Sequence, residues 1–151
     1  MNEKISYKKI ISEKMIDVGN FDYKSTLCDC YKGEDLKKGG VYVLFDELYM
    51  EVVYVGVSVN LKRRLNQHNI ILPKKLNGGY ASKLFSEYKD KDVVKEILKQ
   101  TTVKVFFEED SLIQDLLEKY LIAIYKPKYN FARSYFISEE NKRDTIKLLN
   151  R

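Results

Sequence analysis

The sequence is poor in the residues that build metal clusters and disulfide frameworks. Its 151 residues include no tryptophan, one histidine (His68) and two cysteines, Cys28 and Cys30. A closed structural zinc site needs about four ligands, so these three side chains cannot complete one. A single Cys-x-Cys pair is better explained as two reduced thiols than as a disulfide framework.

Long hydrophobic runs are also missing. The longest apolar run is far shorter than the ~20 residues that cross a membrane. The first residues, Met1-Asn2-Glu3-Lys4, do not resemble the start of a hydrophobic signal segment. We therefore expect a soluble, cytoplasmic protein without a membrane partner, whose length fits one domain better than two.

The charge balance favours a polyanionic partner only weakly. Lysine and arginine number 27 against 22 acidic residues, which gives a net charge of +5 and a pI near 9.0. Only basic residues that follow a line of phosphates indicate nucleic-acid binding, and scattered lysines merely solvate a surface. The net charge alone is compatible with nucleic-acid binding and with a merely solvated basic surface.

The most informative stretch runs from residue 40 to residue 68. Two runs rich in β-branched and aromatic residues, 41–45 and 52–55, flank an acidic turn at 46–47. This pattern predicts an antiparallel hairpin. After Gly56, Leu61 and Leu65 repeat at helical spacing behind an N-cap that is either Ser58 or Asn60.

That helix carries a candidate phosphate site. Arg64 and His68 are four residues apart, so both side chains project from one helical face. Arginine is always charged and can hold two phosphate oxygens at once. Histidine can accept or relay a proton near neutral pH, although a lone histidine is often structural.

The rest of the chain predicts one α+β domain around a three-stranded antiparallel sheet flanked by helices. Residues 18–33 show no period, and 101–108 form the third strand. A capping box opens at Ser111, and Pro127 ends the helix that follows it. The expected helices are 3–15, 80–88, 90–99, 111–126 and a C-terminal one that starts near 138.

Glu118 stands out within the apolar stretch of the helix that begins near 111. A short carboxylate among Leu117, Leu121 and Ile122 is costly to bury without a partner, so we expect a metal or an arginine beside it. One carboxylate with waters and phosphate oxygens suits Mg²⁺. From periodicity alone, a position at the edge of the apolar surface, facing water, is equally compatible.

Together these motifs resemble the GIY-YIG nuclease superfamily. Gly40-Val41-Tyr42 and Tyr54-Val55-Gly56 are similar to its two defining motifs, and Asn60-Leu61 and Arg64 follow, with Arg64 eight residues after Gly56. Glu118 and Asn130 are twelve residues apart, as is common in the family. The resemblance covers about residues 38–133 in the right order.

The resemblance implies a domain layout. Residues 38–133 would form the GIY-YIG core, 1–37 an N-terminal extension and 134–151 a C-terminal helix packed on the same domain. The N-terminal extension could be a docking arm for DNA, a dimer contact or a structural embellishment. The oligomeric state, monomer or homodimer, stays open.

The resemblance also implies an activity, that of a Mg²⁺-dependent DNA endonuclease that leaves 5′-phosphate and 3′-hydroxyl ends, with Mn²⁺ as an alternative ion. Glu118 would bind the metal, Arg64 would stabilise the phosphate, and Tyr42 and Tyr54 would line the cleft. Either Tyr42 or His68 would be the general base, and we favour Tyr42 because it belongs to a defining motif. Site support would come from Gly56 and Asn130.

One departure concerns the phosphate contacts. Many members, especially repair enzymes, have a lysine directly after the glycine of the second motif, where this chain has Val57. Lys62 or a lysine from elsewhere would then contact the phosphate. The remaining candidates for DNA binding are Arg63, Lys74 and Lys75, whose alternative is a solvated basic face.

Three alternatives remain for the function. A non-catalytic nucleic-acid-binding module could retain the fold, although the joint presence of Tyr42, Tyr54, Arg64 and Glu118 argues against it. A structure-specific repair nickase and a homing endonuclease are the rivals among enzymes, both usually larger. A small restriction-like, phage or mobile-element nuclease fits best.

Overall fold

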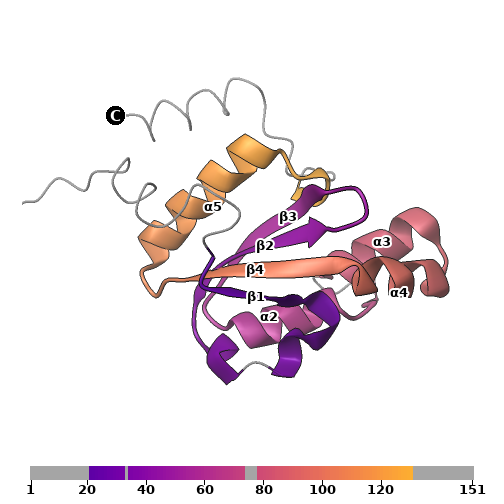
Figure 1. Ribbon diagram of the computed structural model, residues 1–151, viewed down its shortest axis with the longest axis horizontal. Coiled ribbons are helices and arrows are strands. Elements are labelled where there is room, and N and C mark those ends of the chain that lie inside the picture. Colours follow the sequence, from indigo (N-terminus) through magenta and orange to yellow (C-terminus); the bar gives the residue numbers. More distant parts are fainter. Residues whose placement is uncertain (1–20, 33, 74–77, 131–151) are drawn as a thin grey trace, which may run out of the picture.

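A four-stranded antiparallel sheet is the centre of the computed structural model, which describes residues 21–32, 34–73 and 78–130. Its strand order is β1-β4-β2-β3 (Figure 1). The strands are β1 (Tyr23–Thr26), β2 (Gly40–Asp46), β3 (Glu51–Ser58) and β4 (Thr101–Phe107). The predicted α+β class and the three predicted strands are confirmed.

The fourth strand, β1, was not predicted. It has four residues, Tyr-Lys-Ser-Thr, whose side chains alternate between half-buried and exposed at one edge of the sheet. Such a strand buries too little apolar surface to give a period in the sequence. Backbone pairing with β4, from Tyr23 opposite Val105 to Thr26 opposite Thr102, holds this segment as a strand although its composition does not favour one.

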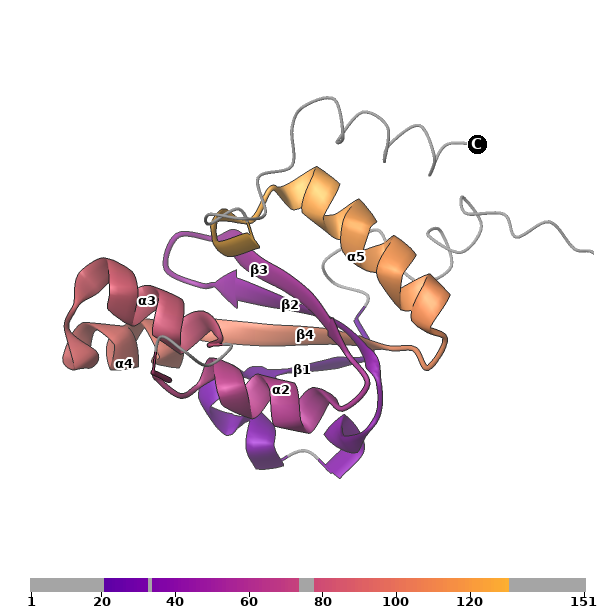
Figure 2. The same cartoon turned by 180° about the vertical axis from the view of Figure 1, so that it is seen from behind.

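Helices cover both faces of the sheet. One face carries α2 (Leu61–His68), and the other carries α5 (Ser111–Tyr125) (Figures 1 and 2). Beside α2 lie α3 (Tyr80–Tyr88) and α4 (Lys91–Lys99), which pack on each other. Three 3-10 helices complete the described chain: η1 (Leu27–Lys32), η2 (Glu34–Lys37) and η3 (Lys128–Asn130).

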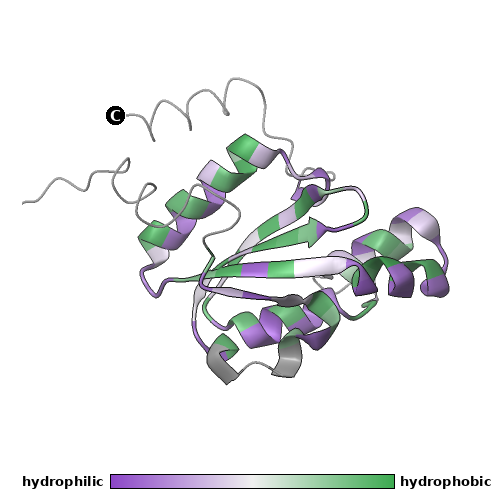
Figure 3. Cartoon of the chain, in the orientation of Figure 1, coloured by the Kyte–Doolittle hydropathy of each residue, from purple (hydrophilic) through white to green (hydrophobic). Residues whose placement is uncertain are grey.

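The alternation of β2 divides the core into two clusters. Val41 and Val43 face α5, whereas Tyr42 and Leu44 face α2. Figure 3 shows hydrophobic and hydrophilic residues alternating along α5 and α4, as expected of helices with one face on the sheet or on another helix. The sheet is therefore buried on both sides at β2, which explains the uninterrupted apolar composition of that strand.

Regular pairing puts Tyr54 on the same side as Tyr42, and a β-bulge adds Val53 to that side. Leu44 pairs with Tyr54 and Phe45 with Val52, so Val53 has no partner across the ladder. A bulge places one extra residue in a strand and re-aims its neighbours. As a result, Val53 and Tyr54 both pack on the α2 side.

The predicted N-cap is confirmed for α2 and wrong for α5. Asn60, one of two predicted caps, caps α2 by accepting from the Arg63 N–H at 3.2 Å. The predicted capping box opening at Ser111 is wrong, because Asp110 caps α5 and accepts from the Leu112 N–H at 2.9 Å. Gln114 donates to the Glu108 carbonyl rather than reaching back to residue 111.

Several predictions fall outside the described residues. These are the helix expected at 3–15, the C-terminal helix expected from about 138, and the basic residues Lys74 and Lys75. Within 21–32, 34–73 and 78–130, no helix has the length and apolar character needed to cross a membrane.

Candidate active site

Tyr42 reaches the site across a glycine on the neighbouring strand. It pairs directly with Gly56, and a Cβ added to Gly56 would lie 2.4 Å from the Tyr42 hydroxyl. The tyrosine ring therefore occupies the space that any side chain at 56 would take. Gly56 serves this close approach rather than an unusual backbone angle, since no described glycine has a positive φ.

His68 binds the Tyr42 hydroxyl in a fixed tautomer. The Tyr42 Oη and the His68 Nε2 are 2.6 Å apart, and both residues are completely buried. The other ring nitrogen, Nδ1, accepts from the Tyr80 backbone N–H at 2.8 Å, so it carries no proton. Burial, followed by the charges of Arg64 and Lys83, lowers the pKa of His68 well below its usual value.

The proton of the neutral imidazole must then lie on Nε2, which donates to Tyr42. This corrects the expectation that His68 titrates near neutral pH, because a histidine buried beside two cations cannot be protonated easily. It also bears on the proton acceptor, since Nε2 already carries a proton in this arrangement.

A second glycine makes this tautomer possible. A Cβ added to Gly79 would lie 2.7 Å from both the Cα and the Nδ1 of His68. Gly79 is the N-cap of α3 and makes no side-chain cap hydrogen bond. It lets the first backbone N–H of α3 approach the imidazole. The sequence analysis did not single out Gly79, although a Gly-Gly pair before a helix is a visible signal of close backbone approach.

The tautomer of His68 can be measured directly, because it is the only histidine. In protein labelled with ¹⁵N-histidine, we expect NMR signals of an unprotonated Nδ1 and a protonated Nε2, unchanged between about pH 5.5 and 8. A midpoint near pH 6.5, or a proton on Nδ1, would contradict the geometry. Gly79→Ala should shift both signals, whereas Ser86→Ala, at an exposed position of the same helix, is the control.

Arg64 and Tyr54 form the rim of the same site. Arg64 is half-buried; its Nη1 donates to Gln67 Oε1 at 2.9 Å and its Nη2 to the Tyr54 hydroxyl at 3.5 Å. The Tyr54 ring lies 6.1 Å from that of Tyr42 and 4.9 Å from that of His68. Both motif tyrosines and the two predicted helix residues therefore meet in one cluster.

Opposing effects act on the pKa of the Tyr42 phenol. Burial, with a contribution from Tyr54, raises the pKa of the Tyr42 phenol well above its usual value. The Arg64 guanidinium opposes this through its charge and a hydrogen bond. In the free protein Tyr42 is therefore a neutral phenol, whose oxygen receives donors from His68 and Arg64.

Glu118 is a half-buried carboxylate on α5. Burial raises its pKa to about 7, Asp115 adds to this rise, and Lys119 opposes it. Its charge is near enough to raise the pKa of Tyr42. Glu118 makes neither a hydrogen bond nor an ion pair with any residue in the described part of the chain.

This environment fits a divalent cation. No group of three or more histidine, cysteine or acidic side chains that could hold a metal occurs among the described residues. A single carboxylate that has no partner within 21–32, 34–73 and 78–130 still suits Mg²⁺, which keeps several waters and takes substrate phosphate oxygens as ligands. Glu118 is the residue that would hold it.

Asn130 fastens the end of η3 to the edge strand of the sheet. Its Oδ1 accepts from the Val55 N–H, and its Nδ2 donates to the Val55 carbonyl, both at 2.8 Å. This pair of bonds occupies the unpaired backbone edge of β3 between Tyr54 and Gly56. The segment after α5 is thereby held against the strand that carries the second motif.

Residues 38–130, more than half of the chain, match the family model described as the GIY-YIG catalytic domain. The chain belongs to the GIY-YIG nuclease superfamily. A comparison with curated proteins found no match, and neither did a comparison with solved structures. The family is therefore established by the domain match, beside the sequence motifs and the geometry around Tyr42.

Two residues expected to bind DNA lie on α2 but away from the GIY-YIG site. Lys62 is half-buried and Arg63 is exposed, and at 3.6 residues per turn neither shares the face of Arg64 and His68. Their predicted contact with DNA stays a prediction.

The structure adds one lysine that the sequence did not single out. Lys83, on α3, places its Nζ 4.8 Å from the centre of the Tyr54 ring. It comes from a helix outside the two motifs, and only the packing of α3 beside α2 brings it to the site. No spacing rule in the sequence connects it to Arg64.

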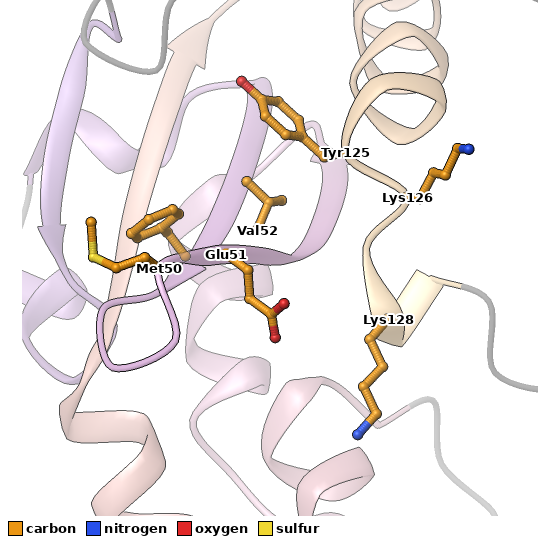
Figure 4. Close-up of a pocket in the computed structure, with 7 residues that line it drawn as sticks. Met50, Glu51, Val52, Tyr125, Lys126 and Lys128 are labelled. Carbon is orange, nitrogen blue, oxygen red and sulfur yellow. The ribbon is translucent and has the colours of Figure 1, made fainter.

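A separate hollow lies away from this site. It has a volume of about 310 Å³ and lies between the β2–β3 hairpin and the end of α5 (Figure 4). Its lining residues are Phe45, Met50, Glu51, Val52, Tyr125, Lys126 and Lys128. None of the predicted catalytic residues lines it, so we assign the chemistry to the Tyr42 cluster.

Proposed function

We propose that the chain is a Mg²⁺-dependent DNA endonuclease that hydrolyses phosphodiester bonds to 5′-phosphate and 3′-hydroxyl ends. The observation that carries the proposal is the meeting of Tyr42, Tyr54, Arg64 and His68 in one cluster of a GIY-YIG domain. Glu118, a carboxylate without a partner among the described residues, acts on the same cluster through its charge, which adds to the raised pKa of Tyr42. A net charge of +5 is compatible with a polyanionic substrate.

The proposed chemistry assigns one role to each residue. Arg64, half-buried and without a carboxylate partner in the described chain, stabilises the negative charge that builds on the phosphate oxygens. Tyr42 first gives up its own proton to solvent and then, as a phenolate, accepts the proton of the attacking water; the His68 donor and the charge of Arg64 stabilise that phenolate. Glu118 would hold a divalent ion, and the ion would supply stabilisation of the charge on the leaving 3′-oxygen.

His68 supports Tyr42 in this scheme. Because its Nε2 is the donor of the 2.6 Å hydrogen bond, it stabilises negative charge on the phenol oxygen and fixes the ring. Tyr54 holds the guanidinium in place. Val57 at the position of the common lysine favours a restriction-like or phage-type enzyme over a repair nickase.

The test separates binding from cutting. In EDTA the protein should bind DNA without cutting it. The logarithm of the binding constant should fall linearly with the logarithm of the salt concentration. Addition of Mg²⁺ should then start cleavage of plasmid or of single-stranded DNA, compared side by side. Binding without cleavage under any divalent ion would favour the non-catalytic module, and binding that is indifferent to salt would contradict contact with the phosphate backbone.

A further inference from the structure

Two cations share one tyrosine at the rim of the site. Lys83 Nζ lies 4.8 Å from the centre of the Tyr54 ring, and Arg64 Nη2 donates to the hydroxyl of the same ring at 3.5 Å. The two come from different helices, α3 and α2. Burial lowers the pKa of Lys83, and the like charge of Arg64 lowers it further.

Neither cation is neutralised within the described part of the chain. The ion pairs there join Lys99 with Glu96, Lys119 with Asp115, and Lys128 with Glu87. Partly buried charges without a counter-ion are unfavourable, so this pair is well suited to bind an anion.

Lys83 is also held in position. Its Nζ donates to the Tyr129 carbonyl at 2.8 Å, and the Tyr129 hydroxyl donates to Glu87. An ammonium group has three donors, of which the carbonyl uses one. Two N–H groups stay available beside Arg64, whose guanidinium also has donors to spare.

We propose that Lys83 binds, together with Arg64, a phosphate of the DNA backbone on the Tyr54 side of the site. This rests on the proposed nuclease function and names a further binding residue for it. Lys83 supplies the ammonium that the family often places directly after the second motif and that Val57 cannot supply. The charge reaches the substrate from α3 instead of from the strand–helix turn.

The decisive variant is Lys83→Gln, because glutamine can still donate to the Tyr129 carbonyl while the charge is lost. DNA binding in EDTA is measured over a salt series for wild type, Lys83→Gln, Lys83→Arg and the control Lys95→Gln. Lys95 is exposed on α4. We expect Lys83→Gln to bind a few-fold more weakly with a salt slope reduced by about one, and Lys83→Arg to restore the slope.

A slope for Lys83→Gln equal to that of wild type and Lys95→Gln would overturn the proposal. A purely structural role would change the melting temperature of Lys83→Gln and leave its salt slope unchanged. Melting temperatures are therefore recorded beside each binding curve.

A second arm does not depend on DNA. Inorganic phosphate should raise the melting temperature of wild type over chloride at equal ionic strength, and raise that of Lys83→Gln less. Equal stabilisation of both proteins would contradict an anion site at Lys83. If wild type neither binds nor cuts DNA yet responds to phosphate through Lys83, the nuclease proposal and the backbone assignment fail, and a small phosphate is the ligand.

Discussion

Glu118→Gln should abolish cleavage while the protein stays folded. The substitution keeps the shape of the side chain and removes the carboxylate that would hold the divalent ion. Such an ion contributes several kcal/mol to the transition state, so single-turnover cleavage should fall by at least about 100-fold. Asp115→Asn is the matched control, since Asp115 lies one turn earlier on α5 in an exposed pair with Lys119, and it should cut within a few-fold of wild type.

The same substitution should stabilise the protein at neutral and higher pH. Because burial raises the pKa of Glu118 to about 7, the folded protein binds a proton more tightly than the unfolded chain does. Wild type therefore loses stability as the pH rises from about 4.5 through 7. In EDTA, the melting temperature of Glu118→Gln should exceed that of wild type above pH 7, and the difference should shrink towards pH 4.5. A cutting Glu118→Gln enzyme would remove this residue from the mechanism.

Tyr42→Phe should be the most damaging conservative change among the aromatic residues. It removes the oxygen to which His68 donates and which we propose accepts the proton of water. General-base contributions are typically about 10²–10⁴-fold, so the loss is measurable in single-turnover experiments. The control is Tyr49→Phe at the exposed tip of the hairpin, which should retain full activity.

The proposed order of action makes a sharper test possible. If His68 acts through Tyr42, then His68→Ala added to Tyr42→Phe should cost little more than Tyr42→Phe alone. Tyr42→Phe also leaves the buried Nε2–H unpaired, at a cost of about 1–3 kcal/mol in stability, so rates are compared well below the melting temperatures. A Tyr42→Phe enzyme within a few-fold of wild type would eliminate Tyr42 as the base.

Local sequence patterns predicted much of the fold because they describe strongly amphipathic or buried elements. The hairpin, α2 and α3 appear where apolar periodicity placed them. The predictions that failed concern features that depend on a few residues only. A four-residue edge strand leaves almost no apolar pattern, and Asp110 displaced Ser111 as a cap by a shift of one residue.

The site shows the same division. The resemblance to the family predicted that Tyr42, Tyr54 and Arg64 belong to one site, and helical spacing put His68 on the same face as Arg64. The environment of each side chain depends on packing between distant segments and could not be predicted. The N–H of Tyr80 that fixes the imidazole and the approach of Lys83 both come from α3, which joins the site only in the folded chain.

Cleavage in water enriched in ¹⁸O, followed by mass analysis of both new DNA ends, tests the central claim most directly. If water attacks the phosphorus at the site of Tyr42, Arg64 and Glu118, the label should appear in the 5′-phosphate and not in the 3′-hydroxyl. Wild type with Mg²⁺ should give this result, and Glu118→Gln should give no product. Ends that carry a 3′-phosphate, or an unlabelled 5′-phosphate, would contradict the proposed hydrolysis.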